Sequence, residues 1–277
     1  MAGKNLLFNL GAVVLTGVMA LALQYPQLDR RISGQTPEGD RRDTENTAVR
    51  LSLLKQLPPS GLGFNNLIAS HTFLQFLQYF GDDVARDQHG TGYGLSPGFF
   101  EVIIRRDPRF IQAYAYMSAS VTIFAGKASK SVELFSIGTQ VVDPRLQPYA
   151  YRLWRGKATD QLLFLGSAEE ARQSYLKAAE AVAIASFTEQ DVIDFPELQF
   201  VPNTNPPMRL AEVVSRQSAK WLEGGQDLTS AQLSAWGSVL SNAKDEKTLK
   251  VVLQELDKIG FRVEVDDRGN PRIVPKS

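Results

Sequence analysis

Residues 105–120, RRDPRFIQAYAYMSAS, return in related form at 141–156 as VVDPRLQPYAYRLWRG. The Asp-Pro pairs begin at Asp107 and Asp143, which are 36 residues apart. An Asp can cap a following helix, and a Pro suits its first turn, where no backbone N–H is needed. A period in the mid-thirties with two helices per unit is typical of a solenoid of helical hairpins. We therefore expect an all-α fold of stacked hairpins.

Hydrophobic periodicity and helix-stop residues predict the other elements. The predicted helices are 48–57, 66–80, 99–106, 109–124, 129–142, a helix that begins over 145–153, 168–187, 208–222, 230–242 and 245–259. Alternating residues at 261–265, turn residues from Asp267 and a return at 271–274 predict a small β-hairpin at the C-terminus.

The predicted helix 66–80 contains Phe73, Phe76 and Phe80 among its apolar residues. The i, i+3, i+4 spacing favours one buried face, and three phenylalanines widen it. The predicted buried face consists of Leu67, Ser70, His71, Leu74, Leu77 and Gln78. We expect His71 to be a core or groove residue rather than a ligand. Gly81 follows the helix as an end signal, and a polar, glycine-rich loop is predicted for 82–98.

Small and aromatic residues in the same region resemble the tetratricopeptide repeat family. Ala113-Tyr114 follows the first Asp-Pro pair as at a repeat junction, and Ala171, Tyr175 and Ala178 have the small, aromatic, small spacing of the family's second helix. Tyr79-Phe80-Gly81-Asp82, ahead of the DPRF junction, resembles a group of degenerate, membrane-anchored bacterial tetratricopeptide proteins. The resemblance implies a solenoid whose groove binds other proteins.

The sequence also departs from the family pattern. Trp154 stands where a small first-helix residue is usual, and the proline expected after Ala178 is absent. About five extra residues are inserted around 156–166. The resemblance therefore implies a short, irregular solenoid of about two or three units.

The N-terminal segment Leu6–Leu23 is apolar and uncharged. As a helix its 18 residues would span roughly 27 Å, close to the thickness of a hydrocarbon core. We predict a single-pass membrane anchor. A cleaved signal peptide is the alternative, since Ala20-Leu21-Ala22 has the form of a cleavage site. Positive and negative charges are mixed after the segment, so they do not decide on which side of the membrane the soluble domain lies.

These features divide the chain into five predicted parts. They are 1–28, the anchor or signal peptide; 29–60, a flexible tether and short helix; 61–193, the tetratricopeptide-like domain; 194–207, a Pro-rich linker; and 208–277, a C-terminal helical segment that ends in the β-hairpin. The tether is predicted because residues 29–47 are charged and nearly free of apolar groups.

Composition excludes several functional classes. The chain has 30 basic and 30 acidic residues, so no basic surplus favours nucleic acid as a partner. It has no Cys, which excludes disulfides, thiolate metal sites and a Cys nucleophile. Gly90–Gly94 lacks the Lys and the preceding strand of a phosphate-binding loop. We expect no catalytic residue, no metal site and no cofactor.

Arginine and aromatic residues gather around the two junctions and form the candidate partner-binding site. They are Arg105, Arg106, Arg109, Tyr114, Tyr149, Arg152, Trp154 and Arg155. Arg, Tyr and Trp are enriched at interface hot spots. The alternative is that the aromatic rings pack the hairpins and the arginines cap helix ends.

The sequence thus predicts a non-enzymatic, membrane-tethered scaffold or assembly factor that binds protein partners, either a membrane complex or its subunits. One alternative is a stable structural subunit of a larger photosynthetic or cell-envelope complex. The other is an envelope enzyme or carbohydrate binder that uses Asp82, Asp83 and His89 in the glycine-rich loop.

Overall fold

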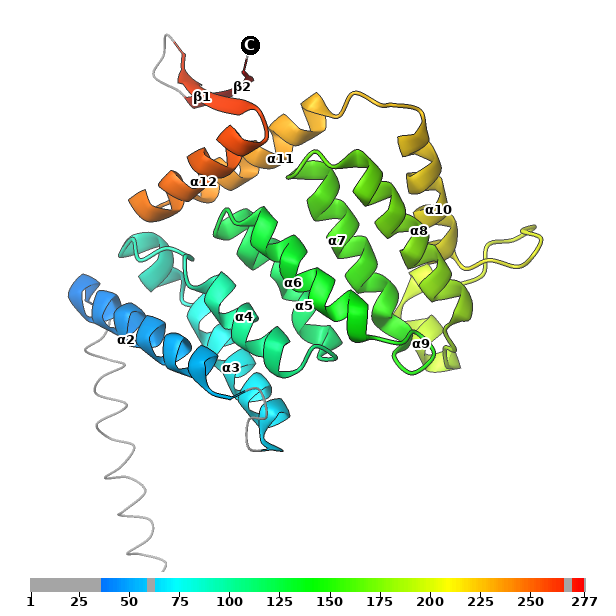
Figure 1. Ribbon diagram of the computed structural model, residues 1–277, viewed down its shortest axis with the longest axis horizontal. Coiled ribbons are helices and arrows are strands. Elements are labelled where there is room, and N and C mark those ends of the chain that lie inside the picture. Colours follow the sequence, from blue (N-terminus) through cyan, green and yellow to red (C-terminus); the bar gives the residue numbers. More distant parts are fainter. Residues whose placement is uncertain (1–35, 59–62, 267–270, 277) are drawn as a thin grey trace, which may run out of the picture.

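Helices make up most of the computed structural model, which describes residues 36–58, 63–266 and 271–276 (Figure 1). The α-helices are α2 (Pro37–Gln56), α3 (Asn65–Phe80), α4 (Ser96–Arg106), α5 (Ile111–Met117), α6 (Ala128–Val141), α7 (Tyr151–Leu163), α8 (Ala168–Ile184), α9 (Glu189–Asp194), α10 (Leu210–Glu223), α11 (Thr229–Asn242) and α12 (Glu246–Lys258). Two π-helical segments, η2 (Val84–Gln88) and η3 (Ser118–Phe124), and two 3₁₀ turns, η4 (Pro148–Ala150) and η5 (Pro196–Leu198), join some of them.

The predominantly helical fold and the C-terminal β-hairpin are confirmed. Strands β1 (Phe261–Val265) and β2 (Pro271–Pro275) pair antiparallel, with Val263 opposite Ile273. The predicted turn from Asp267 lies outside the described residues. Within the described part of the chain, no helix is both long and apolar enough to cross a membrane. The predicted anchor at Leu6–Leu23 lies outside that part.

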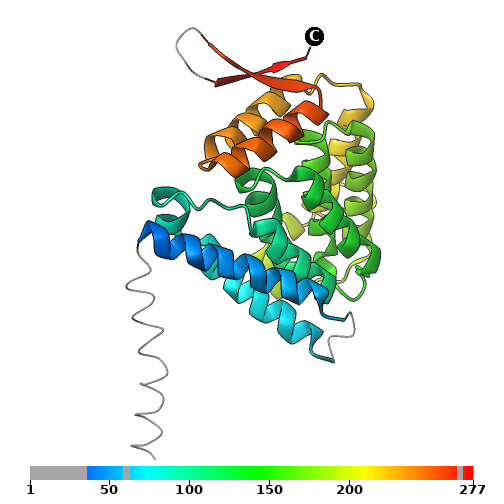
Figure 2. The same ribbon diagram turned by 60° about the vertical axis from the view of Figure 1, so that its left-hand side comes forward.

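The helices follow one another in a row, in the order α3, α4, α6, α7, α8 and α10, each packed on the next (Figures 1 and 2). Helix α5 and η3 pack on α7 and α6, and α2 packs on α4. Helices α11 and α12 with the β-hairpin lie along one side of the row, where α11 packs on η3 and α7. Neighbouring pairs such as α3–α4 and α7–α8 form hairpins stacked side by side, a packing that is compatible with a helical repeat.

Two glycines let neighbouring helices approach closely in the middle of the row. A Cβ built at Gly138 of α6 would lie 2.8 Å from Leu153 Cδ2 and closer still to the Tyr114 hydroxyl. A Cβ at Gly156 of α7 would lie 2.6 Å from Phe135 Cζ. Helix α7 runs unbroken through Gly156 to Leu163, so most of the region 156–166, where extra residues were expected, is helical.

The two Asp-Pro junctions share one hydrogen bond. Asp107 Oδ1 accepts from the Arg109 N–H at 3.1 Å, and Asp143 Oδ1 accepts from the Arg145 N–H at 3.0 Å. Each Asp therefore caps a turn between helices, and the prediction that it caps the next helix is wrong. Helix α7 begins at Tyr151, later than predicted, because this turn and the 3₁₀ turn at Pro148 precede it.

The predicted tether is wrong for residues 37–47, because helix α2 begins at Pro37. Thr36 caps it by accepting a hydrogen bond from the Gly39 N–H, and Pro37 stands in its first turn. Asp40 is buried against His89. Charged side chains thus form specific contacts here, although few apolar groups are available. Residues 29–35 of the predicted tether lie outside the described part.

The predicted Pro-rich linker at 194–207 is packed rather than free. Leu198 of η5 is fully buried in a cluster with Tyr151, Val182 and Ala211. The chain on either side of the segment pairs through two backbone hydrogen bonds, Val201 N–H to Met208 and Leu210 N–H to Gln199. Helices α8 and α10 also pack on each other. The prolines stop helices in this segment without separating two domains.

Candidate protein-interaction surface

Two residues of the predicted Arg-aromatic site are buried and take part in internal contacts. The Arg106 guanidinium donates to the carbonyl oxygens of Leu54, Leu57 and Pro58 at the end of α2. The Tyr114 hydroxyl donates to the Pro108 carbonyl oxygen at 3.1 Å, and burial raises its pKa. Both side chains are unavailable to a partner, so the prediction is wrong for them.

Tyr149 and Arg152 belong to a second internal network. The Tyr149 hydroxyl donates to Asp191 of α9. The Arg152 guanidinium forms an ion pair with Glu197 at 2.9 Å and lies 4.2 Å from the centre of the Phe195 ring. This network attaches the start of α7 to the segment after α8. Both residues thus have partners within the chain while they remain partly accessible, and a role for them in binding stays a prediction.

The other four predicted site residues are at least partly accessible. Trp154 packs against the edge of the cluster around Tyr151, with Lys157 over its ring. Arg155 is half-buried and Arg109 is exposed. Arg105 is exposed and forms ion pairs on α4 and α6. A role for these four in binding stays a prediction.

The glycine-rich loop also uses its candidate residues for structure. His89 pairs with Asp40 of α2, and Asp82 Oδ1 accepts from the Ala85 N–H at 3.2 Å. The Tyr79 hydroxyl donates to the Gly92 carbonyl oxygen. Within the described ranges, no group of three or more His, Cys, Asp or Glu residues is placed to hold a metal ion.

The buried face of α3 agrees with the prediction at Phe76 but not at the six residues predicted to form its centre. Ala69, Thr72, Phe76 and Tyr79 are buried, and Phe76 packs edge-to-face with the rings of Phe99 and Phe100 in α4. The six residues predicted at its centre are exposed instead, so the prediction that His71 belongs to the core is wrong. Among them Leu67 is 64% exposed and Leu74 is 59% exposed.

This exposed face of α3 carries no charge. The helix contains no Asp, Glu, Lys or Arg over Asn65–Phe80. Its outer residues are Leu67, Ser70, His71, Leu74, Leu77 and Gln78, and Phe64 precedes them, also exposed. Depletion of charge is the compositional sign of an interface core, and an apolar patch of this kind marks an interaction site.

Helix α2 adds a second exposed apolar stripe. Val49, Leu53 and Leu57 are spaced four residues apart and therefore lie on one side of the helix. All three are exposed, whereas Leu51 is buried against the core. We call the exposed apolar residues of α2 and α3, with Phe64, the outer face.

A cleft of about 610 Å³ separates α2 from α3. Both helices pack on α4 and make few contacts with each other. The early turns of α2 and the last turns of α3 line the same cleft, so the two helices run antiparallel. Its lining includes Asp40, Asp43 and Arg50 from α2 and Gln75, Gln78 and Tyr79 from α3.

A buried arginine lies at the base of this cleft. Arg86 of η2 lies 4.1 Å from the centre of the Tyr79 ring and donates to the Gly92 carbonyl oxygen and to Thr44. Burial raises the pKa of Tyr79 to about 12, although Arg86 acts in the opposite direction. These contacts join α2, α3 and the glycine-rich loop into one support for the cleft.

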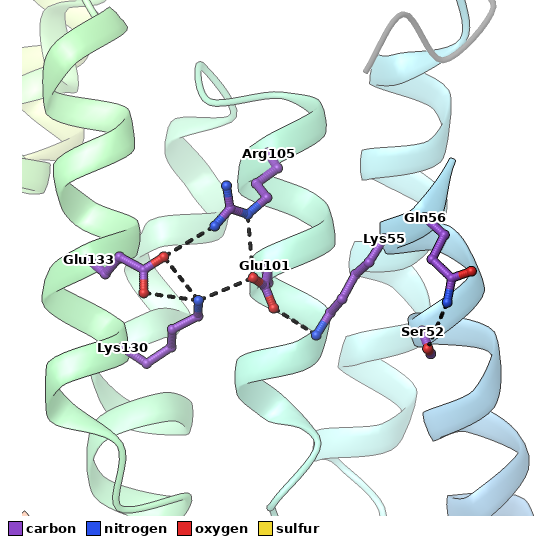
Figure 3. A network of polar contacts seen from close by, with 7 residues as sticks. All are labelled: Ser52, Lys55, Gln56, Glu101, Arg105, Lys130 and Glu133. Atoms are coloured by element: carbon purple, nitrogen blue, oxygen red, sulfur yellow. Dashed lines mark hydrogen bonds and ion pairs between the residues drawn. The ribbon is translucent and has the colours of Figure 1, made fainter. Parts of the chain in front are cut away.

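An ionic network holds α2 on its other side (Figure 3). Glu101 of α4 pairs with Lys55 of α2 at 2.7 Å, with Lys130 of α6 at 3.2 Å and with Arg105 at 3.4 Å. Partial burial favours the neutral acid, but the two lysines outweigh it and lower the pKa of Glu101 to about 2. Helix α2 is therefore held by these ion pairs together with Leu51 and Leu54, which pack on the core, while its apolar stripe faces outward.

One chemically unusual group was missed by the sequence interpretation. Asp160 of α7 is fully buried and accepts from Thr122 at 2.9 Å and from Ser131 at 2.6 Å, while its Oδ1 has no partner in the described structure. Burial raises its pKa to about 6, against the effect of these hydroxyl donors. Nothing in the spacing of this residue distinguishes it from a surface carboxylate, so sequence offered no signal.

The outer face, in contrast, did have a sequence signal. Sixteen helical residues without a charge are unusual for a helix at the end of a row, where one side meets solvent.

Comparison of the chain with protein-family models, curated proteins and solved structures finds no match in any of the three.

Proposed function

We propose that the chain is a non-enzymatic, tetratricopeptide-like scaffold or assembly factor that binds a protein partner through the outer face of α2 and α3. The observation that carries the proposal is the exposed, uncharged apolar face at one end of the helical row. Terminal units of helical solenoids normally have a polar outer side, because that side meets water. An apolar terminal side is stable in solution when a partner covers it.

The other candidate sites support the proposal by their contacts. Arg106 and Arg152 are bound to groups of the chain itself, and His89 is paired with Asp40. The enzyme alternative relies on the loop around His89, whose side chains hold η2 and α2 in place. The membrane tether remains part of the proposal through the sequence of Leu6–Leu23. A tether raises the local concentration of the scaffold near membrane-bound partners.

The test is co-purification with the affinity-tagged full chain from its native host. Leu53→Asp combined with Leu74→Asp places two charges on the outer face, and we expect it to remove the specific partner from the purified sample. Leu146→Asp is the matched control, because Leu146 is 79% exposed in the turn after α6, away from α2 and α3. A partner retained by the double variant contradicts the proposal.

A stable structural subunit is the second candidate function, favoured by the same apolar face, because a permanent partner would cover it at all times. Native gel electrophoresis separates the two roles. A constant subunit co-migrates with the mature complex, whereas an assembly factor does so only during assembly.

A further inference from the structure

Another pocket, of about 400 Å³, lies on the side of α2 that faces the helical row. Leu51 and Lys55 of α2 form one wall, and the end of the glycine-rich loop with the first turn of α4 forms another. Lys127 and Lys130, at the start of α6, complete the lining. Sites for small molecules typically have volumes of about 300–1,000 Å³, so the pocket can hold a small ligand. None of its lining residues belongs to the outer face.

Positive charge is in surplus in this pocket. Its charged lining residues are Lys55, Lys127, Lys130 and Glu101. Three ammonium groups against one carboxylate leave a surplus of two positive charges. Lys127 is half-buried and forms no ion pair with any residue that the structure describes.

The neighbours of this network do not remove the surplus. Glu133 pairs with Lys130, but it lies outside the lining and also pairs with Arg105 at 3.2 Å. The added carboxylate of Glu133 is thus matched by the added guanidinium of Arg105. An anion that enters the pocket would therefore neutralise charge rather than compete with an internal carboxylate.

Glu101 brings two of the lysines together (Figure 3). Its two oxygens accept from lysines of different helices, Oε2 from Lys55 at 2.7 Å and Oε1 from Lys130 at 3.2 Å. The lowered pKa of Glu101, about 2, is the result of these cations. An ammonium group has three donors, and Lys55 uses one of them on Glu101, so donors remain for a ligand. Side chains already held in place lose less entropy on binding.

The backbone at the start of α4 shapes the pocket but supplies no donor. The Gly98 and Phe99 N–H groups both donate to the Leu95 carbonyl oxygen, so this helix end contributes only the positive end of its dipole. A Cβ at Gly98 would lie 3.4 Å from Leu51 Cδ1 and 3.8 Å from Lys55 Nζ. Glycine at this position therefore leaves the space beside the ammonium group open.

The sequence interpretation rejected a phosphate site in this loop because the loop has no lysine of its own. The fold supplies that lysine from elsewhere: Lys55 comes from α2, and Lys127 and Lys130 come from the start of α6. Three separate ammonium groups suit a tetrahedral phosphate, whereas the planar fork of arginine suits a carboxylate. A phosphomonoester carries a charge of about −1.5 to −2 at pH 7, which matches the surplus.

We propose that this pocket binds an organic phosphomonoester, whose phosphate group contacts the ammonium groups of Lys55, Lys127 and Lys130. The carbon part of the ligand lies against Leu51 and Pro97, which are buried apolar residues of the lining. The inference is independent of the proposed function, because it involves neither the outer face nor a protein partner.

The experiment is isothermal titration calorimetry on the purified full chain in detergent. The probes are inorganic phosphate, glycerol 3-phosphate and dihexanoyl phosphatidic acid, which share the phosphate group. We expect saturable binding of glycerol 3-phosphate, tighter than that of inorganic phosphate because of the carbon contacts. Tighter binding of the phosphatidic acid identifies a lipid headgroup as the source of the phosphate, and tighter binding of glycerol 3-phosphate identifies a soluble metabolite.

Lys127→Gln removes one ammonium group without breaking an ion pair of the described structure. We expect it to weaken binding about tenfold and to leave the thermal unfolding temperature unchanged. Lys220→Gln is the matched control, because Lys220 is exposed on α10 and pairs with no described residue. Ala48→Phe places a ring in the pocket and preserves every charge, so it should abolish binding.

Three results would overturn the inference. One is the absence of saturable binding of all three probes up to about 10 mM. Another is equal weakening by Lys127→Gln and Lys220→Gln, which would show attraction by overall charge alone. The third is unchanged binding by a folded Ala48→Phe variant, which would place the phosphate outside the pocket. If Ala48→Phe fails to fold, the comparison of the two lysine variants still decides. Co-purification through the outer face is unaffected by any of these results.

Discussion

The Arg106 guanidinium donates a 2.7 Å hydrogen bond to the carbonyl oxygen of Leu57, the residue that ends α2. It also donates to Leu54 at 2.9 Å and to Pro58. The last carbonyl groups of a helix have no partner within the helix, so a buried cation at this point satisfies several of them. One residue of α4 thereby fixes where α2 ends and how α2 lies on the row.

Arg106→Gln should therefore loosen α2 and destabilise the chain. Hydrogen bonds to a charged group contribute more than neutral ones, and buried carbonyl groups lose their donor, so we expect a loss of about 2–4 kcal/mol in the free energy of unfolding. Urea unfolding measures this loss, and hydrogen exchange should show faster exchange in α2. The neighbouring Arg105→Gln is the control, because its exposed ion pairs contribute at most about 1 kcal/mol. Equal effects of the two substitutions would contradict this role of Arg106.

Gly138→Ala tests the close stacking of the hairpins. The added methyl group would overlap Leu153 and Tyr114, and overpacking of a core typically costs about 1–3 kcal/mol. Gly237→Ala in α11 is the matched control, since a Cβ there meets nothing within 4 Å, and it should stabilise the helix by about 0.5–1 kcal/mol. Thermal unfolding of both variants gives the comparison. Stabilisation by Gly138→Ala would show that α5, α6 and α7 are not in such close contact.

Phe76 and Leu74 distinguish the two faces of α3. Phe76 is fully buried among aromatic rings, so Phe76→Ala should cost about 3–5 kcal/mol. Leu74 lies on the outer face, so Leu74→Asp should change stability of the isolated chain by no more than about 0.5 kcal/mol. Chemical unfolding of the two variants measures the free energy of unfolding that each substitution removes. A large loss from Leu74→Asp alone would mean that the outer face is buried within the chain.

Asp160 makes stability depend on pH. Burial raises its pKa to about 6 in the folded chain, above the ordinary value of 3.8, so the folded state binds the proton more tightly than the unfolded state. The resulting stabilisation is complete below about pH 4 and is lost as the pH rises through 6. From pH 4.5 to 7.5 the loss amounts to about 2 kcal/mol by linkage.

Asp160→Asn should remove this part of the pH dependence. The amide does not titrate, so the free energy of unfolding should fall by about 2 kcal/mol less between pH 4.5 and 7.5 than in the unmodified chain. Glu101 does not interfere, because its lowered pKa affects stability below about pH 4.5. Urea unfolding at several pH values measures both slopes. Identical slopes would show that Asp160 is ionised throughout this range.

The sequence predicted the order of helices well because helix ends have local chemical signals. The Asp-Pro pairs, Gly81 and Asp245 mark element boundaries that the structure places within a few residues. The terminal β-hairpin could be predicted from the sequence equally well, because the alternation of apolar and polar residues at 261–265 differs from any helical period.

The buried face of α3 could not be predicted in the same way. The helix is apolar or uncharged on every side, so the spacing of Leu67 and Leu74 and the spacing of Phe76 and Tyr79 both fit a buried stripe. Packing against the rings of α4 decides between them, and that choice depends on residues distant in sequence. The charge-free composition indicated an unusual helix, but it did not indicate which side stays exposed.

The first half of helix α2, before the predicted helix 48–57, was missed for a related reason. Its early turns have few apolar residues, and sequence interpretation equated that with an inability to fold. The contact of Asp40 with His89 joins residues 49 positions apart and has no local pattern. The eight Arg and aromatic residues around the junctions were chosen by type, and type alone does not separate Arg106, which caps a helix, from exposed Arg109.

Site-directed photocrosslinking tests the central claim most directly. A benzophenone amino acid is placed at Leu53, at Leu74 or, as the control, at Leu146, in the full chain expressed in its native host. The account predicts one discrete adduct, with the same protein, from positions 53 and 74, and none of it from 146. No adduct from 53 and 74, or the same adduct from all three positions, would contradict an interface on the outer face of α2 and α3.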